Sequence, residues 1–359
     1  MELDNAAALR RTVIRRGDES SLMANIGSPF SPLWIDTENA SQRALDKLER
    51  GQIGEDEFHL VSFFIANGYC IIEKAIDTAL IDGYLAEVEQ MFSTRPDLWV
   101  SEGPAIKRLG EAQVDRALTK VLDTYMVSRR ALQMAFAPKL ERMLKIIFGE
   151  APAVHQGLHF QVGSTQAIHQ DTAYVVIKPA LALAAAWIAL EDVKPGGGEL
   201  IYYRGSHRFG DFIYPGEQRH WHTDAHGHDI HNHHLAWLHR EAVERGAPLE
   251  YFWPKKGTLL IWHADLAHGG APIVNSAYTR KSIVFHYCPV SARPAYLDSS
   301  AAAMSDFHTT PDGAFCSSYY PEFSETPPAA QPAPSDEPAA PDPAKTKPRR
   351  ASRKETALV

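Results

Sequence analysis

The sequence predicts an α+β fold in which N-terminal helices flank a double-stranded β-helix, the two-sheet jelly roll that cupins also have. Apolar residues recur at helical spacing up to about residue 150, and short apolar segments separated by Gly, Pro and polar residues follow Pro152. A helical block followed by seven or eight short strands favours two packed sheets with helices covering one outer face.

Composition divides the 359 residues into three parts. We expect an irregular N-terminal extension over residues 1–54, a folded domain over 55–324 and a disordered tail over 325–359. The tail is rich in Pro, Ala, Lys and Arg and cannot bury enough apolar surface to fold alone. Within the folded domain, helices are expected in 55–150 and the jelly roll in 151–295.

The spacing of apolar residues also predicts the individual elements of the N-terminal half. Helices are expected at 40–51, 80–92, 114–125 and 132–147, with a short strand at 69–72. Asp77 or Thr78 would cap the second of these helices, and Gly149 would close the last.

After Pro152 the expected elements are strands, bounded by turn signals such as Gly196-Gly197-Gly198. They cover residues 154–162, 173–178, 182–191, 199–203, 249–253, 258–263 and 281–288. Residues 208–248 have weak strand character and contain eight histidines between His220 and His239. These histidines lack the helical pair with a glutamate that a metallohydrolase shows, so we expect a solvated or substrate-covering loop rather than a second metal site.

Charge, hydropathy and cysteine content exclude several classes of protein. The formal charge of −8 gives no electrostatic reason to bind nucleic acid or an anionic membrane. The chain has no apolar run of about 18 residues that could span a bilayer and no apolar signal region at its start, so we expect a cytoplasmic protein. Cys70, Cys288 and Cys316 are too few and too scattered for a disulfide framework or a thiolate zinc site. The sequence carries no signal for the oligomeric state.

The pair His169 and Asp171 provides the first candidate site residues. On an extended segment, side chains two positions apart point to the same side, so both could reach one metal ion. If His268 supplies a third ligand, two histidines and one carboxylate occupy one face of an octahedral ion, as in the facial triad of non-haem iron(II) oxygenases. A second such pair, His263 and Asp265, has no distant histidine or arginine at suitable spacing, and we expect it to support the site or to pack at a strand end.

Arg280 follows His268 by twelve residues and opens the last strong strand of the sequence. An arginine there can hold the distal carboxylate of 2-oxoglutarate through two parallel charge-assisted hydrogen bonds. Ser282 lies on the same strand face and can add a hydroxyl group. The three metal-ligand candidates and this arginine together make one chemical hypothesis.

At these residues the sequence resembles the phytanoyl-CoA dioxygenase family of Fe(II)- and 2-oxoglutarate-dependent oxygenases. The resemblance covers residues 55–294 and implies that His169, Asp171 and His268 ligate iron and that Arg280 anchors 2-oxoglutarate. It is carried, in chain order, by His169-Gln170-Asp171 with Tyr174, Trp187-Ile188-Ala189-Leu190-Glu191-Asp192, Gly198-Glu199-Leu200, Gly205-Ser206-His207, His268-Gly269, Asn275 and Arg280-Lys281.

The resemblance also implies which residues surround the cosubstrate. Trp187 and Lys120 match family positions that line the cosubstrate pocket. Many family members have a serine two residues after the distal histidine, where this chain has Gly270. Part of the grip on the cosubstrate is therefore expected from Ser282 instead.

A protein of this kind would use Fe(II), 2-oxoglutarate and O2 to hydroxylate an unactivated C–H bond of a small-molecule metabolite, with release of succinate and CO2. Asp171 fills the position where a halide binds in related halogenases, so hydroxylation is favoured over halogenation. Gln170, Tyr174 and the segment 208–248 are expected to shape the substrate side, but they carry no readable code for a substrate. One alternative is a cupin-like non-catalytic protein that binds a sugar or lipid, although such a binder would need neither the triad nor Arg280. Another is a hydrolase in which the metal activates water.

Overall fold

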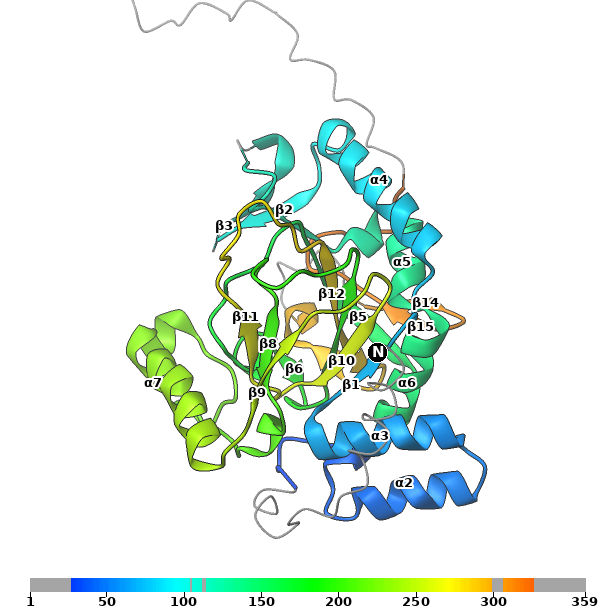
Figure 1. The fold of residues 1–359 in the computed structure, drawn as a ribbon, viewed down its shortest axis with the longest axis vertical. Helices are drawn as coiled ribbons and strands as arrows, with labels where there is room; N and C mark the ends of the chain where they lie inside the picture. Colours follow the sequence, from blue (N-terminus) through cyan, green and yellow to red (C-terminus); the bar gives the residue numbers. More distant parts are fainter. Residues whose placement is uncertain (1–26, 104, 112–113, 299–305, 326–359) are drawn as a thin grey trace, which may run out of the picture. The chain divides into compact units, whose positions relative to one another are not determined.

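The structure is a computed structural model that describes residues 27–103, 105–111, 114–298 and 306–325. Its centre is a double-stranded β-helix made of a large and a small sheet, with helices on the outside (Figure 1). The predicted α+β jelly roll is thereby confirmed. The expected tail, apart from its first residue, and the first half of the N-terminal extension lie outside the described residues, and the domain boundaries stay predictions. In the described part of the chain, no helix is both long enough and apolar enough to cross a bilayer.

The larger sheet is antiparallel along its main path, with the strand order β1-β10-β7-β12-β5-β4-β2-β3. Its strands are β1 (Tyr69–Ile72), β2 (Trp99–Glu102), β3 (Ala105–Arg108), β4 (Lys120–Leu122), β5 (Pro152–Phe160), β7 (Ala184–Ala189), β10 (Leu259–His263) and β12 (Ser282–Pro289). β14 (His308–Thr310) pairs with β15 (Gly313–Phe315), which runs parallel to β5.

The smaller sheet has the order β11-β8-β9 and faces the larger sheet across the apolar interior of the barrel. It consists of β8 (Leu200–Tyr203), β9 (Leu249–Phe252) and β11 (His268–Gly270), while β6 (Ile177–Lys178) and β13 (Arg293–Pro294) form a separate ribbon. Because side chains alternate along a strand, Tyr202 of β8 points into the interior with Trp187 of β7 and Trp262 of β10. The next residue, Tyr203, faces outward instead.

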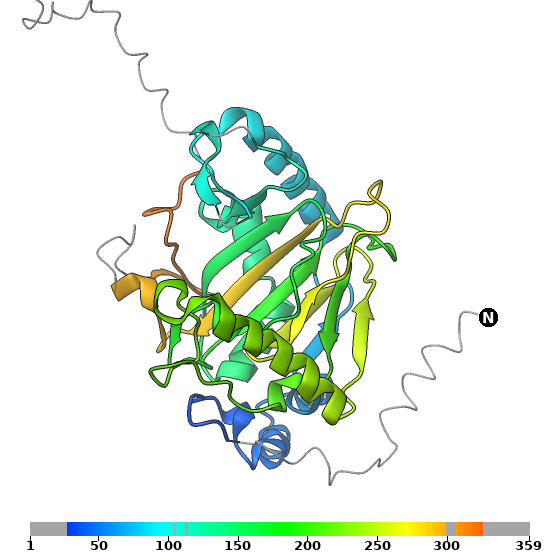
Figure 2. The same ribbon diagram turned by 90° about the vertical axis from the view of Figure 1, so that its left-hand side faces the viewer.

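Helices cover the outer faces of both sheets (Figures 1 and 2). They are α2 (Ala40–Glu49), α3 (Glu55–Asn67), α4 (Thr78–Thr94), α5 (Arg129–Ala135), α6 (Pro138–Phe148) and α7 (Thr223–Glu244), with 3-10 turns η1 (Trp34–Asp36), η2 (Leu109–Glu111), η3 (Thr124–Met126), η4 (Asp171–Ala173), η5 (Ser206–Arg208) and η6 (Ala295–Asp298). Outward residues of the larger sheet, including Ile261 and Phe285, pack against α2 to α6 in one apolar core. Two predicted helix ends are confirmed, since the Asp77 side chain caps α4 and Gly149 ends α6 in the left-handed conformation.

The expected helix over residues 114–125 is wrong. This segment contains a turn closed by Asp115, the strand β4 and the 3-10 turn η3. β4 pairs with both β2 and β5, so sheet pairing overrides the helical spacing of its apolar residues. Asp123 then adopts a left-handed conformation at φ 47° and accepts a hydrogen bond from the Gly157 amide at 2.6 Å. The preceding hairpin of β2 and β3 was not predicted either.

The helix expected over 132–147 is two helices, α5 and α6, which meet at Pro138. Proline has no amide hydrogen and its ring clashes with the carbonyl four residues earlier, so it starts a helix more readily than it continues one. Pro138 occupies the first turn of α6, where the missing donor costs nothing. The signal for this break was present in the sequence.

The prediction of a loop over residues 208–248 is also wrong, because most of this segment forms α7. Its buried face consists of His231, His234, Leu238 and Ala242, which recur at helical spacing. Two of these four residues are histidines, so the apolar pattern that normally reveals a helix is weak. Gly227 interrupts the helix near its start with φ 68° and ψ 176°.

Candidate metal centre

The segment before η4 carries His169 and the strand β11 carries His268, and these two segments lie side by side at the candidate site. His169 and His268 form an antiparallel bridge in which each backbone amide donates to the carbonyl of the other at 2.9 Å. β11 is fixed in turn by pairing with β8, where His268 lies opposite Tyr202. Glycine is required at position 269, because a Cβ atom there would lie 2.7 Å from the Gln166 carbonyl oxygen. Asp171 is not on an extended segment as expected, but begins the 3-10 turn η4.

His169, Asp171 and His268 are, in the described part of the chain, the one group of His, Cys, Asp or Glu side chains placed to hold a metal ion. Oδ1 of Asp171 lies 3.8 Å from Nε2 of His169 and 3.7 Å from Nε2 of His268. Nδ1 of each imidazole lies 2.8 Å from a backbone carbonyl, that of Ala167 or Leu266, and this contact directs Nε2 toward the carboxylate. Two imidazoles and one carboxylate on one side suit a divalent ion such as iron(II), with positions left open for other ligands.

Burial and neighbouring charges set the protonation states that metal binding requires. Burial lowers the pKa of His169 to about 3, with help from His268 and against the effect of Asp171. Burial by itself would raise the pKa of Asp171, but the imidazoles of His268 and His286 hold that pKa well below its usual range. Neutral imidazoles and an ionised carboxylate are the forms that ligate metals. His169 and Asp171 therefore have the protonation states that a divalent metal ion needs at neutral pH.

A second group of polar side chains is buried in the barrel without protein partners. Nε and Nη1 of Arg280, Oγ of Ser282 and Nε1 of Trp187 accept or donate no hydrogen bond among the described residues. The guanidinium of Arg280 lies 5.8 Å from the Trp187 ring and 5.7 Å from the Phe160 ring, and Nζ of Lys120 lies 5.3 Å from the same Phe160 ring. A buried polar group left unpaired costs about 1–3 kcal/mol, so several such groups in one place indicate a ligand site.

The charges around Arg280 specify what kind of ligand fits. Burial lowers the pKa of Arg280 to about 10, and Glu199 opposes this effect. Burial and the positive charge of Arg280 lower the pKa of Lys120. Two desolvated cations, of which Arg280 has two nitrogen atoms unpaired among the described residues, are suited to a carboxylate, which accepts two parallel hydrogen bonds from a guanidinium.

Tyr174 and Gln170, the two residues expected on the substrate side, have different surroundings. Tyr174 is 42% exposed; its ring lies 5.2 Å from that of His169, and its hydroxyl lies 2.8 Å from Nε2 of His231 on α7. Gln170 is buried; it donates to a backbone carbonyl at 2.9 Å, and its Oε1 lies 3.2 Å from Nε2 of His234 on α7. The structure thus leaves Tyr174 open beside the metal-binding group, whereas Gln170 connects the metal-binding loop to α7.

Three residues next to the triad were not predicted from the sequence. Trp262 donates from Nε1 to Oδ2 of Asp171 at 2.8 Å, and Nε2 of His286 lies 3.5 Å from the same oxygen. Nε2 of Gln166 lies 3.2 Å from Nε2 of His169. Strand alternation could have revealed His286, which follows the predicted serine by four residues on the same strand face. Trp262 and Gln166 carry no comparable signal.

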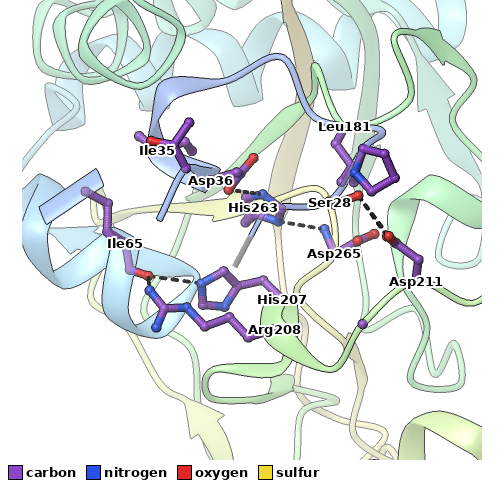
Figure 3. A pocket seen from close by; sticks show the side chains of 14 residues that line it. Ser28, Ile35, Asp36, Ile65, Leu181, His207, Arg208, Asp211, His263 and Asp265 are labelled. Atoms are coloured by element: carbon purple, nitrogen blue, oxygen red, sulfur yellow. Dashed lines mark hydrogen bonds and ion pairs between the residues drawn. The ribbon is translucent and has the colours of Figure 1, made fainter. Parts of the chain in front are cut away.

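His263 and Asp265, the second His-x-Asp pair, line a cavity of about 180 Å³ together with Asp36, His207 and Asp211 (Figure 3). Asp265 accepts a hydrogen bond from Thr172 at 2.6 Å and forms an ion pair with Arg219. His263 lies 3.1 Å from Asp36, at the end of η1. Both side chains are engaged by neighbouring protein groups, which agrees with a supporting role.

Comparison with known sequences identifies related proteins over most of the jelly roll. The sequence model of a family described as phytanoyl-CoA dioxygenase (PhyH) matches residues 64–282. Peroxisomal phytanoyl-CoA dioxygenase of Rattus norvegicus is 22% identical over 237 residues, which cover 63% of this chain and 66% of the rat protein. The Homo sapiens protein of the same name is 22% identical over 248 residues, covering 66% of this chain and 69% of the relative. The chain thus spans just under two thirds of the length of the rat protein.

Solved structures share the fold. The epimerase SnoN, solved with Fe3+, alpha-ketoglutarate and nogalamycin RO, superposes with a TM-score of 0.50 and 16% identity over 67% of this chain and 86% of that protein. EctD from S. alaskensis, solved with 2-oxoglutarate and 5-hydroxyectoine, gives a TM-score of 0.50 and 16% identity over 67% of this chain and 78% of EctD. At this level of identity the similarity establishes the jelly-roll architecture.

Proposed function

The chain belongs to the phytanoyl-CoA dioxygenase family, and on that premise we propose that it is an Fe(II)- and 2-oxoglutarate-dependent oxygenase acting on a small-molecule metabolite. One observation carries the proposal: a metal-binding triad shares the barrel with a buried arginine, two of whose nitrogen atoms are unpaired among the described residues. The proposed reaction is hydroxylation, in which 2-oxoglutarate, O2 and a substrate C–H bond give succinate, CO2 and a hydroxylated product.

In this proposal the triad holds the iron, and Arg280 with the residues around it holds the cosubstrate. His169, Asp171 and His268 are the iron ligands, and Arg280 and Ser282 bind the distal carboxylate of 2-oxoglutarate. Bound iron supplies the redox chemistry by which oxygen is reduced and a C–H bond is oxidised. The protein contributes orientation, because the imidazole rings are fixed by backbone carbonyls, and a dry site.

The walls of the cosubstrate site would exclude water and fix the dicarboxylate. Trp187 and Phe160 flank the Arg280 guanidinium, and Lys120 adds a second positive charge beside Phe160. Trp187 is 1% exposed, so its unpaired indole N–H has no access to bulk solvent. We assign Trp187 and Lys120 to cosubstrate binding.

The substrate would enter beside Tyr174. This residue combines exposure with contact to a proposed iron ligand, and its hydroxyl is held by His231. Gln170, by contrast, is covered and would shape the substrate side through its bond to α7 rather than by direct contact. We therefore propose that α7 and Tyr174 together form the substrate wall.

The first test is an anaerobic titration of the Fe(II)-loaded protein with 2-oxoglutarate. The oxygenase proposal expects a weak visible metal-to-ligand charge-transfer band, followed under air by substrate-dependent succinate release against a panel of metabolites. Asp171→Ala and His268→Ala should abolish both signals, and Arg280→Gln should raise the concentration of 2-oxoglutarate needed for the band. Arg95→Gln is the matched control, because Arg95 is also buried but is engaged by Asp97.

The outcomes separate the alternatives. Turnover retained in both ligand variants would refute the assignment of the triad. Binding of a sugar or lipid without a charge-transfer band would favour a cupin-like binder, and turnover without oxygen would favour a hydrolase.

A further inference from the structure

The two carboxylate oxygens of Asp171 have different neighbours. Oδ1 faces Nε2 of His169 and of His268, whereas Oδ2 accepts a hydrogen bond from Trp262 and lies 3.5 Å from His286. We propose that Trp262 and His286 are positioning residues that hold Oδ2 away from the metal and so make Asp171 a one-oxygen ligand. This inference rests on the metal centre of the proposed function.

The chemistry of the Trp262 side chain and its position in the fold both favour the hydrogen bond to Oδ2 of Asp171. It lies on β10, is 2% exposed, and is fixed by pairing with Tyr69 on one side and Ala185 on the other. An indole has a single polar hydrogen and no acceptor, and here that hydrogen is donated to Oδ2 at 2.8 Å. Its ring also lies 4.8 Å from that of His268, so one side chain contacts two of the three proposed ligands.

His286 reaches the same oxygen from a different strand. It lies on β12 four residues after Ser282 and is 4% exposed. The pairing of β12 with β7 stays in register through His286 and Tyr287, so His286 keeps the regular alternation that puts it on the same strand face as Ser282.

Among the described residues, no other group forms a hydrogen bond with Nε2 of His286. Neither of its ring nitrogens has a hydrogen-bond partner among the described residues. Leaving a buried polar atom unpaired costs about 1–3 kcal/mol, and a shift of a few tenths of an ångström toward Oδ2 would satisfy Nε2. The ion-pair distance of 3.5 Å therefore marks Oδ2 as the partner of this atom.

Holding Oδ2 has a consequence for the number of open metal positions. An octahedral ion held by three protein atoms keeps three positions for other ligands. If both oxygens of Asp171 were to bind, one of those positions would be lost. The hydrogen bond from Trp262 to Oδ2, with His286 beside the same oxygen, would therefore reserve that position for the cosubstrate or oxygen.

The experiment measures metal binding rather than turnover. Mn(II) affinity is determined by calorimetry for the wild type, Trp262→Phe, His286→Leu and His286→Gln, followed by titration of each Mn(II)-loaded protein with 2-oxoglutarate. His155→Leu is the matched control, because His155 is equally buried and its ring lies 6.4 Å from that of His286, but no contact joins it to Asp171. Thermal unfolding of each variant measures any general loss of structure.

We expect Trp262→Phe and His286→Leu to weaken Mn(II) binding by about 10-fold to 100-fold, the range typical for partners of metal ligands. Glutamine can place an N–H where the imidazole has Nε2, so His286→Gln should recover most of the affinity. His155→Leu should bind Mn(II) as the wild type does. If His286→Leu does not fold, Trp262→Phe and His286→Gln still provide the test.

Two results would overturn the inference: wild-type Mn(II) affinity in Trp262→Phe and the His286 variants, or an equal loss in His155→Leu. If the wild type binds Mn(II) and the variants bind it equally well, this inference is refuted and the proposed function is not. A wild type that binds no divalent metal refutes the proposed function as well.

Discussion

Replacing Arg280 by glutamine should remove the ability of 2-oxoglutarate to stabilise the protein. The guanidinium is 2% exposed, and burial lowers its pKa from its ordinary value to about 10. That difference corresponds to roughly 3 kcal/mol for keeping the charge inside the barrel. Because two of its nitrogens are unpaired among the described residues, a bound carboxylate is the group that would offset this cost.

The size of the effect follows from the hydrogen bonds that would be lost. Two hydrogen bonds between charged groups contribute about 3–6 kcal/mol together, so cosubstrate binding should weaken by about 100-fold or more. Without cosubstrate, Arg280→Gln should have the opposite effect on the stability of the protein. Arg280→Gln removes a buried unpaired charge, so its unfolding midpoint should equal or exceed that of the wild type.

Thermal unfolding of the Mn(II)-loaded proteins under anaerobic conditions tests both expectations. At 100 times its Kd, 2-oxoglutarate should stabilise the wild type by about 2.7 kcal/mol, which is a shift of about 5–10 °C for a domain of this size. At the same concentration the variant, which binds at least about 100-fold more weakly, should gain no more than about 0.4 kcal/mol, a shift below about 2 °C. 2-Oxobutyrate lacks the distal carboxylate, so it should act alike on both proteins. A full shift in the variant, or an equal shift of the wild type by 2-oxobutyrate, would refute the reasoning.

Two further predictions concern the surroundings of the site. Burial opposes the charge on His263, but the carboxylate of Asp36 outweighs this effect and raises the pKa of His263 above its ordinary value. The stability that this pair contributes is therefore fully present below about pH 6.5 and is lost as the pH rises through the raised pKa. The urea midpoint at about pH 5.5 and about pH 8.5 should therefore differ less in Asp36→Asn than in the wild type, and an unchanged difference would count against the pair. Gln170→Ala removes the bonds to the Asp265 carbonyl and to His234, so amide exchange in α7 should quicken while that in β10 stays slow; equal exchange in both proteins would contradict the link.

Some features of the protein could be read from local sequence because they depend on local chemistry. The cap at Asp77 and the left-handed end at Gly149 follow from residues that bond or bend their own backbone. Most strands after Pro152 lie close to their expected places, since they are bounded by turn residues. The strand expected over residues 173–178 is wrong, because only β6 at Ile177–Lys178 follows the 3-10 turn η4 there. The candidate triad and Arg280 could also be named in advance, because few residue types can hold a metal or a carboxylate.

Other features were decided by contacts between distant segments. β4 is a strand because β2 and β5 pair with it, although its own apolar residues have helical spacing. α7 escaped detection because imidazoles, which sequence patterns count as polar, occupy part of its buried face. Burial and hydrogen bonding to the metal-binding loop make histidine acceptable there.

The same division applies to the candidate site. Local sequence was enough to name the side chains that could hold iron and 2-oxoglutarate, because that choice rests on the chemistry of imidazole, carboxylate and guanidinium groups. The meeting of His169 and His268 through a two-residue bridge, and the positions of Trp262 and His286 around the outer oxygen of Asp171, appear only in the folded chain. Those positions arise from strand pairing between segments far apart in the chain, which no local pattern encodes.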